Sequence, residues 1–242
     1  MADGGRVEHL VGRMVVSNNA RIHRLDAGRP NPRPLAGQQW HDRLAAAAPR
    51  IRSEWDAFVA AGGRIPLIEE VVDEHQGNDG PWRAGLLVRR DVPIRPLADA
   101  FPETVAALRD VPNLRAALWS VLEPGTELPE HVGPNAGILR YHLGVRCPEG
   151  AALRVGETVT PYREGDGIWF DDTEPHAAWN RGTADRVTLF CEIERPLPGV
   201  AARANRMVQA MIALDPRYRH APVRAARLHR RLNFGQGPAA RN

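Results

Sequence analysis

The residues best suited to chemistry in this chain are two histidines, His131 and His176, which lie 45 positions apart. In a jelly roll, His131 would sit at the end of one strand and His176 after another. So long a spacing suits two metal ligands at the mouth of a β-barrel rather than a zinc finger. A lone histidine on a strand is more often a structural residue, so the metal-site hypothesis depends on what surrounds the pair. Cys147 and Cys191 lack the CxxC spacing of a zinc site and are expected to be buried, reduced thiols.

Three further polar residues fall on predicted strands. Arg140 and His142 are two positions apart, so both side chains are expected on one face of their strand. Arg186 begins another strand, and a buried arginine offers a planar fork that suits a carboxylate. All 32 basic residues are arginine, which excludes enzymes that use a lysine Schiff base. The net charge of only +3 gives no argument for a nucleic-acid partner.

The elements that must position these residues are mostly short strands. β-type runs broken by Gly, Pro and Asp cover residues 86–90, 116–122, 137–146, 152–155, 168–171, 177–180 and 186–194. Several short strands with turn signals between them predict a sandwich or jelly roll. Apolar residues at spacings of three and four predict a helix over 38–61, and further helices are expected over 97–110, 200–214 and 221–232. Residues 64–85 have an irregular pattern.

The domain prediction follows from these elements. Residues 1–36 are polar and end in the proline-rich stretch GRPNPRPLAG, so we expect a loosely ordered N-terminal arm. Residues 37–196 form a jelly-roll domain with N-terminal helices, and residues 197–242 form a C-terminal helical extension. No run reaches the roughly 18 apolar residues of a membrane span, and the N-terminus lacks the apolar stretch of a signal peptide. We therefore expect a cytoplasmic protein without a membrane partner.

The stretch from 119 to 196 carries four motifs in order: PGT…HVGPN, LRYHLGV, EGD…FDDTEPHAAWN, and the strand RVTLF closed by ERP. Together they resemble the aspartyl/asparaginyl β-hydroxylase family of oxygenases. The resemblance implies a mainly β fold with flanking helices (α+β) around a double-stranded β-helix, a jelly-roll or cupin-like core. It also implies that the 37–196 domain is a dioxygenase. Such an enzyme uses Fe(II), 2-oxoglutarate and O2 to hydroxylate an unactivated C–H bond, and it releases succinate and CO2.

The same resemblance assigns roles to individual residues. His131 and His176 would bind the metal, and the 2-oxoglutarate site would comprise Ser120, Arg140, His142, Arg186 and, as a further wall, Trp82. The usual carboxylate of a His-x-Asp pair is missing, because the chain reads His131-Val132-Gly133. The resemblance therefore implies two protein ligands with water at the third position. Glu130 and Asp172 are the nearby carboxylates that could stand in, and a bracing role is favoured for Asp172.

The substrate face is predicted to be apolar. Leu118 and Ile138 share faces with Ser120 and Arg140, at positions where the resemblance leads us to expect basic residues. A small molecule, an amino-acid derivative or a peptide is therefore the expected substrate. Three alternatives stay open: a halogenase with chloride in the open position, a non-redox cupin-like binding protein, and a protein that grips an anionic partner or a second copy (a homodimer) through the basic segment 217–231.

Overall fold

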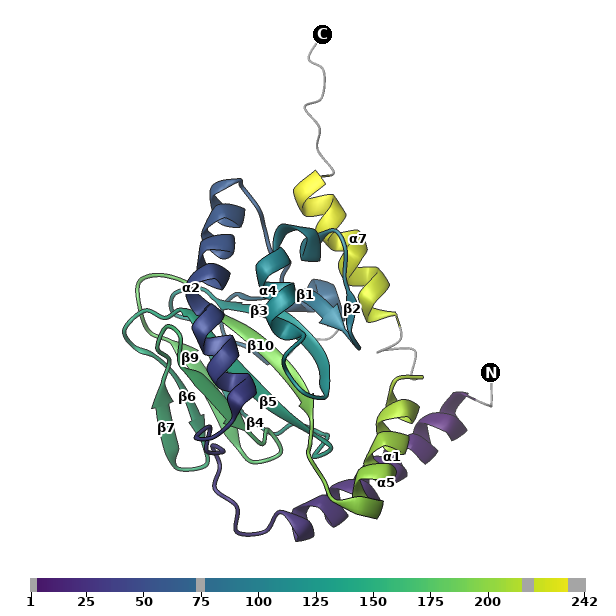
Figure 1. Ribbon diagram of the computed structural model, residues 1–242. Helices are drawn as coiled ribbons and strands as arrows, with labels where there is room; N and C mark the ends of the chain where they lie inside the picture. The colour runs from purple at the N-terminus through teal and green to yellow at the C-terminus, as the bar shows by residue number, and fades with distance from the viewer. Residues whose placement is uncertain (1–3, 73–76, 215–219, 235–242) are drawn as a thin grey trace.

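The computed structural model describes residues 4–72, 77–214 and 220–234, and its centre is a pair of antiparallel sheets that face each other (Figure 1). The larger sheet has the order β2 (Val92–Pro93), β1 (Trp82–Arg89), β3 (Leu114–Leu122), β10 (Arg186–Glu194), β5 (Ile138–Arg146) and β8 (Gly167–Phe170). The smaller sheet has the order β4 (Glu127–His131), β9 (His176–Asn180), β6 (Ala151–Val155) and β7 (Thr158–Pro161). This architecture confirms the predicted mainly β, jelly-roll fold with flanking helices.

The outer face of the larger sheet is covered by α2 (Gln39–Ala60) and α4 (Pro102–Leu108). The apolar stripe predicted for the helix over 38–61 is its buried face, with Leu44 and Ile51 almost fully buried. Trp55 packs against Trp119 of β3 with their ring centroids 4.9 Å apart. Because odd-numbered residues of β3 fill this core, the even-numbered ones must face the smaller sheet.

Between the two sheets lies a second, smaller apolar cluster that includes Leu128, Leu153, Phe170 and Ala178. The inner face of the larger sheet departs from this apolar character. Ser120, His142, Arg186 and Thr188 are all buried there, although buried polar side chains usually need partners. A polar interior at the centre of an apolar sandwich marks the region in which to look for a site.

Several predicted boundaries were wrong. Residues 4–25, predicted as part of a loosely ordered arm, form α1 (Gly4–Leu25), whose buried face includes Asn18 and Ile22 and packs on α5. The polar composition concealed this helix because its buried face carries an asparagine. The irregular stretch 64–85 contains α3 (Ile68–Val72) and the start of β1.

Other elements differ in detail from the prediction. The helix predicted over 97–110 is a 3-10 helix (Leu97–Ala100) followed by α4, because Pro102 lacks the N–H needed to continue one helix. Strands β4 and β7 lie in segments that the sequence left unassigned. The proline-rich residues 26–38 are non-helical, as predicted, and Arg33 forms a bridge to Trp169 of β8.

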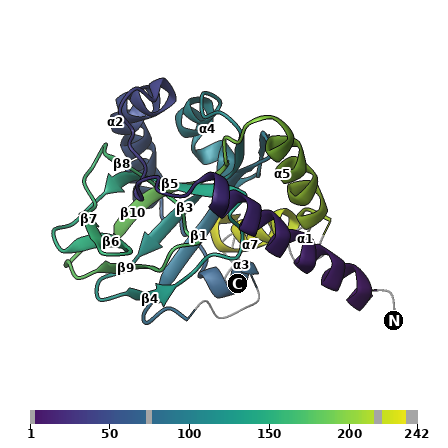
Figure 2. The same ribbon diagram turned by 90° about the horizontal axis from the view of Figure 1, so that it is seen from below.

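The C-terminal helices α5 (Gly199–Ile212) and α7 (Ala221–Phe234) confirm the helical prediction for this part of the chain. In Figures 1 and 2, α1, α5 and α7 lie on the same side of the molecule, with α1 against α5 and α7 against α3 and β1. Residues 217–219 of the predicted basic segment 217–231 lie outside the described residues. None of the described helices combines the length and apolar character that a bilayer crossing requires.

Candidate active site

The two candidate metal ligands face each other on neighbouring strands. His131 ends β4, His176 begins β9, and the two residues are a register pair whose ring centroids lie 4.1 Å apart. Nδ1 of His131 donates to the carbonyl of Pro129 (2.7 Å), and Nδ1 of His176 donates to the carbonyl of Glu174 (3.0 Å). A carbonyl can only accept, so Nδ1 carries the proton in each ring. In the neutral rings Nε2 is therefore left with the lone pair that binds a metal.

A carboxylate fills the space beside Gly133 that a His-x-Asp side chain would occupy. A Cβ on Gly133 would lie within 2.7 Å of Cγ, Oδ1 and Oδ2 of Asp172. Asp172 is buried, its Oδ2 accepts from Nε of Arg140 (2.7 Å), and its Oδ1 has no partner among the described residues. A carboxylate from the loop that precedes His176 thus takes the space beside Gly133.

Arg140 occupies the predicted face of β5, but its guanidinium is already engaged. It donates to Asp172 and to Glu192 on β10, and it lies 5.2 Å from the ring centre of Phe190. Burial alone would lower the pKa of Arg140, but the two carboxylates raise it. These contacts favour a role for Arg140 in holding Asp172 over the predicted role as a cosubstrate ligand.

Arg186 has the opposite surroundings. It is 1% exposed, its guanidinium lies 4.9 Å from the ring centre of Tyr162, and Nη1 donates to Oγ1 of Thr188 (2.8 Å). No described carboxylate pairs with it, and its Nε lacks a partner among the described residues. Burial lowers the pKa of Arg186, although a guanidinium stays charged at neutral pH. A buried cation without a counter-ion is costly, and a carboxylate-bearing ligand would remove that cost.

The remaining predicted cosubstrate residues lie next to Arg186. Thr188 pairs in register with Ser120 of β3, and Ser120 Oγ accepts from Nε1 of Trp82 (3.1 Å). His142 Nδ1 is 2.8 Å from the hydroxyl of Tyr162, and its Nε2 is buried without a described partner. The structure therefore brings four of the five predicted residues into one polar cluster, with Arg140 on the same face but differently paired.

This polar cluster is continuous with the imidazole pair. The ring centre of Phe170 lies 5.6 Å from that of His176 and 5.1 Å from that of His142, so Phe170 forms the wall between the two imidazoles. Burial is the largest cause that lowers the pKa of His142, followed by the charges of Arg186 and Arg140. His142 is therefore neutral and presents Nε2 to the interior.

The predicted substrate residues extend this face. Leu118 lies in one row with Phe190 and His142 and is half-buried, whereas Ile138 is buried at the start of β5, opposite Glu194. Both positions are apolar in space as well as in sequence. Leu118 also packs against the apolar cluster formed by α7 and β1.

Sequence reasoning missed Tyr162, Thr188 and Phe190. Thr188 had a usable signal, because it lies two positions after Arg186 on one strand and must share its face. Tyr162 had none, because it follows β7, a strand that the sequence did not reveal. Among the described residues, no three His, Cys, Asp or Glu side chains gather in a way that could hold a metal ion.

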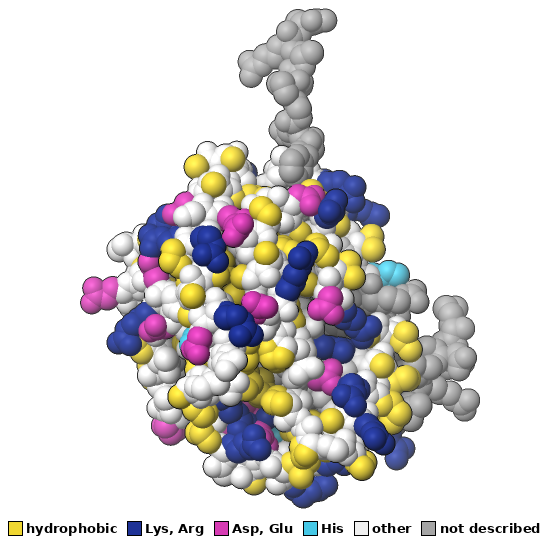
Figure 3. Space-filling view, viewed as in Figure 1, with side chains coloured by type: hydrophobic (Ala, Val, Ile, Leu, Met, Phe, Trp, Pro, Cys, Tyr) yellow, Lys and Arg dark blue, Asp and Glu magenta, His cyan; other side chains and the backbone are white. Residues whose placement is uncertain are grey.

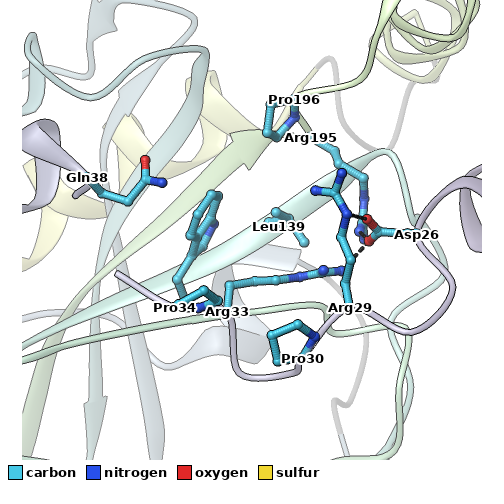
Figure 4. Close-up of a pocket in the computed structure, with 10 residues that line it drawn as sticks. Asp26, Arg29, Pro30, Arg33, Pro34, Gln38, Leu139, Arg195 and Pro196 are labelled. Carbon is cyan, nitrogen blue, oxygen red and sulfur yellow. Dashed lines mark hydrogen bonds and ion pairs between the residues drawn. The ribbon is translucent and has the colours of Figure 1, made fainter. Parts of the chain in front are cut away.

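A separate cavity of about 250 Å³ lies behind β8 and contains none of these residues (Figure 4). Trp169, the neighbour of Phe170, lines it from the opposite side of the strand. Asp26 and Asp171 pair there with Arg33 and Arg195. Burial would raise the pKa of Asp171, but Arg195 and Thr173 lower it. These ion pairs hold the start of the loop that carries Asp172.

α1 contacts the loops beside both candidate metal ligands. Asn19 donates to the carbonyl of Pro134 (2.8 Å) and accepts from the backbone N–H of Ala136 (3.0 Å), both in the loop after His131. A ring nitrogen of His23 lies 3.0 Å from Oγ1 of Thr173, in the loop before His176. This helix, which lies in the predicted loosely ordered arm, is therefore part of the support of the site.

A sequence model described as aspartyl/asparaginyl beta-hydroxylase matches residues 45–196. The ornithine lipid ester-linked acyl 2-hydroxylase of Rhizobium tropici is 31% identical over 194 residues, which are 78% of this chain and 69% of that protein. Human aspartate beta-hydroxylase domain-containing protein 2 is 39% identical over 90 residues, covering 36% of this chain and 24% of its own length. Human aspartyl/asparaginyl beta-hydroxylase is 31% identical over 101 residues, 41% of this chain and 13% of that protein.

The solved structures that match are more distant. A predicted oxalate decarboxylase from Thermotoga maritima has a TM-score of 0.36 and 18% identity, over 50% of this chain and 86% of that chain. A cupin 2 conserved barrel domain protein from Salinispora arenicola has a TM-score of 0.33 and 13% identity, over 53% and 86% of the two chains. The fold assignment therefore depends on the two sheets of this chain itself.

Proposed function

The chain belongs to the aspartyl/asparaginyl β-hydroxylase family, and from this premise we propose that it is an Fe(II)- and 2-oxoglutarate-dependent hydroxylase. The observation that carries the proposal is a pair of adjacent imidazoles whose Nδ1 atoms are engaged by carbonyls, which leaves Nε2 for a metal. The pair adjoins a polar cluster that holds a buried arginine without a carboxylate partner among the described residues. 2-Oxoglutarate has two acid ends. A metal would bind its 2-oxo acid end, and a cation would bind its far carboxylate.

Different side chains would bind the metal and the two ends of 2-oxoglutarate. His131 and His176 would hold the iron, and Asp172 would offer a carboxylate or hydrogen-bond acceptor beside them. Arg186 would bind the distal carboxylate of 2-oxoglutarate, with Thr188 fixing its guanidinium. Burial raises the pKa of Tyr162 to about 12, so its hydroxyl keeps its proton and can donate to Nδ1 of His142. His142 then has an N–H at Nε2 to donate to the cosubstrate.

Iron(II) at this pair would supply the activation of O2, coupled to the conversion of 2-oxoglutarate to succinate and CO2, that makes an aliphatic C–H bond reactive. The side chains around it orient the cosubstrate and exclude water from the interior. The halogenase alternative is distinguished from hydroxylation by the product, into which a halogenase would introduce chloride.

The reacting part of the substrate is proposed to be aliphatic. Leu118 and Phe190 form an apolar row beside His142, and the arginine next to Phe190, Arg140, is already paired with two carboxylates. A small molecule with an acyl chain fits this row better than an acidic peptide, and the name of the Rhizobium relative describes a hydroxylase of such a chain. An amino-acid derivative or peptide with an apolar side chain is the other class that fits.

The metal site is tested by anaerobic addition of iron(II) and 2-oxoglutarate. We expect a metal-to-ligand absorption band in the visible range that is lost in His131→Ala and in His176→Ala. His41→Ala is the matched control, because His41 lies on α2 and bonds to Tyr141 on the outer face of the larger sheet. No band in the parent, or no succinate once O2 is admitted to the protein loaded with iron(II) and 2-oxoglutarate, would favour the non-redox cupin-like alternative. A band that persists in both site variants would remove His131 and His176 from the metal site.

The cosubstrate site is tested by calorimetry with Arg186→Met and, as the control, Arg181→Met. Arg186 is buried, whereas Arg181 is exposed and pairs with Glu127. Losing a buried, charge-assisted carboxylate contact costs about 2–5 kcal/mol, so 2-oxoglutarate affinity should fall at least about thirty-fold in Arg186→Met. Unchanged affinity in that variant would remove Arg186 from the site.

A further inference from the structure

The three helices on one side of the molecule share an unusual charge. Residues 11–25 of α1, residues 199–214 around α5 and residues 221–233 of α7 contain nine arginines and no Asp or Glu. The whole chain has a net charge of only +3, so the rest of it must carry −6. The net positive charge of the protein is therefore concentrated on these three helical segments, and Figure 2 shows that their helices lie on one side of the molecule.

Most of these arginines are exposed, and none of the exposed ones pairs with a carboxylate among the described residues. They are Arg13, Arg21, Arg24, Arg203, Arg206, Arg227, Arg230 and Arg231. Exposed arginines on α2 behave differently, because Arg43 pairs with Asp110 (3.3 Å) and Arg50 with Glu103 (3.2 Å). Among the described residues, these eight arginines thus lack the counter-ions that the protein provides elsewhere on its surface.

The same helices also expose apolar side chains. Eleven large hydrophobic residues of the described chain are exposed, and seven of them lie in these three segments: Val16, Leu25, Val200, Met207, Leu214, Val223 and Leu232. Dark blue and yellow side chains accordingly lie next to one another along the right-hand edge of Figure 3. A surface that is both basic and apolar suits an anionic partner with an apolar interior.

We propose that this surface, the basic apolar face of α1, α5 and α7, binds the surface of an anionic phospholipid bilayer. Arginine forks pair with lipid phosphates, and the exposed Val, Leu and Met side chains enter the boundary between headgroups and acyl chains. A second copy of the chain is disfavoured, because two such faces would repel each other. Duplex or single-stranded nucleic acid is disfavoured because the apolar side chains gain nothing from a polyphosphate, and the three segments hold no Trp, Tyr or Phe for base stacking.

Peripheral contact needs no membrane span, so this inference replaces the expectation of no membrane partner, which considered spanning segments alone. The face also lies beside the candidate site, because α1 contacts the loops next to His131 and His176. The inference concerns the surface and is independent of iron, 2-oxoglutarate and the identity of the substrate.

The test is flotation of the full chain with vesicles of phosphatidylcholine alone and with vesicles of an equal mixture of phosphatidylcholine and phosphatidylglycerol. Binding is expected with the mixed vesicles only and should weaken as salt is raised. The double variant Arg203→Gln/Arg206→Gln should lower partitioning about thirty-fold, the effect of two basic residues at a charged membrane. Met207→Gln should weaken binding as well, and its unfolding midpoint should stay unchanged because Met207 is 59% exposed.

Arg43→Gln/Arg50→Gln on α2 is the matched control, since it removes the same charge from another surface. If this control partitions within about twofold of the parent, the result supports binding through the basic apolar face. Long-range attraction by net charge alone is screened at physiological salt. Equal loss in both double variants, or no binding to the mixed vesicles, would overturn the proposal. Binding of duplex DNA with the same arginine dependence, in the absence of vesicle binding, would overturn it in favour of a nucleic-acid surface.

Discussion

The contact between Gly133 and Asp172 gives the sharpest test of how the site is built. Gly133 does not have a positive φ, so its backbone would accept alanine without strain. In an ordinary position Gly→Ala stabilises a protein by about 0.4–1 kcal/mol. Here, however, the new Cβ would lie within 2.7 Å of the carboxylate atoms of Asp172, well inside normal contact. The carboxylate must shift, and we expect it to lose its 2.7 Å hydrogen bond from Nε of Arg140.

The expected size of the effect follows from that bond. A hydrogen bond to a charged group contributes about 1.5–3 kcal/mol, so Gly133→Ala should destabilise the protein by about 2 kcal/mol despite the favourable backbone effect. Urea unfolding of the parent and of the variant measures this directly. Gly12→Ala is the control, because its Cβ would meet nothing within 4 Å and its helix should gain about 0.5–1 kcal/mol.

A double-mutant cycle separates this contact from other effects. In Gly133→Ala/Asp172→Ala the obstructing carboxylate is gone, so the alanine at 133 should cost nothing more. The two single changes should therefore couple by at least about 1 kcal/mol. If Gly133→Ala unfolds at the urea midpoint of the parent, or if the two changes are additive, then Asp172 does not occupy the space beside Gly133.

Three further predictions concern stability and cosubstrate binding. Burial lowers the pKa of His229 to about 4 from 6.5, so between these values the unfolded chain binds a proton that the folded chain does not. Stability should therefore rise with pH across that window, and His229→Leu should remove about 3 kcal/mol of this dependence in urea unfolding at a series of pH values. Glu54 accepts from the backbone N–H of Glu103 (2.6 Å) and Thr104 (2.8 Å) at the start of α4, so Glu54→Ala should cost about 1–2 kcal/mol in the same assay. Tyr162→Phe removes the partner of His142 Nδ1 and should weaken 2-oxoglutarate binding about tenfold by calorimetry, and unchanged binding would separate Tyr162 from the site.

The strands and the helices of the core could be predicted because their patterns are strong. The stripe from Trp40 to Trp55 repeats at helical spacing, and the strand over 186–194 was assigned with the bounds that the structure gives it. Weak patterns failed for physical reasons. β7 is short and mostly exposed, so it has no apolar alternation, and α1 buries an asparagine where a sequence reading expects an apolar residue.

The candidate site was predictable as a set of residues but not as a set of partners. Motifs pointed to Ser120, His142 and Arg186, and strand periodicity explains why they share an interior face. Long-range pairing was invisible in the sequence. Neither the approach of Asp172 to Gly133 nor the hydrogen bond from Trp82 to Ser120 follows from spacing, because each joins segments about 40 residues apart. The first joins two loops, and the second joins the neighbouring strands β1 and β3.

The contrast between Arg140 and Arg186 shows what the structure adds to the functional argument. Both are arginines on the inner face of the larger sheet, and the sequence alone assigned them one role. Arg140 has two carboxylate partners and is stable as it is, whereas Arg186 has a hydroxyl, an aromatic face and an unpaired Nε. A buried cation without a carboxylate makes folding less favourable, so the chain is more stable when a dianionic ligand occupies the interior. Of the two arginines, Arg186 therefore destabilises the ligand-free protein more, and it is also the one better placed to select a dicarboxylate.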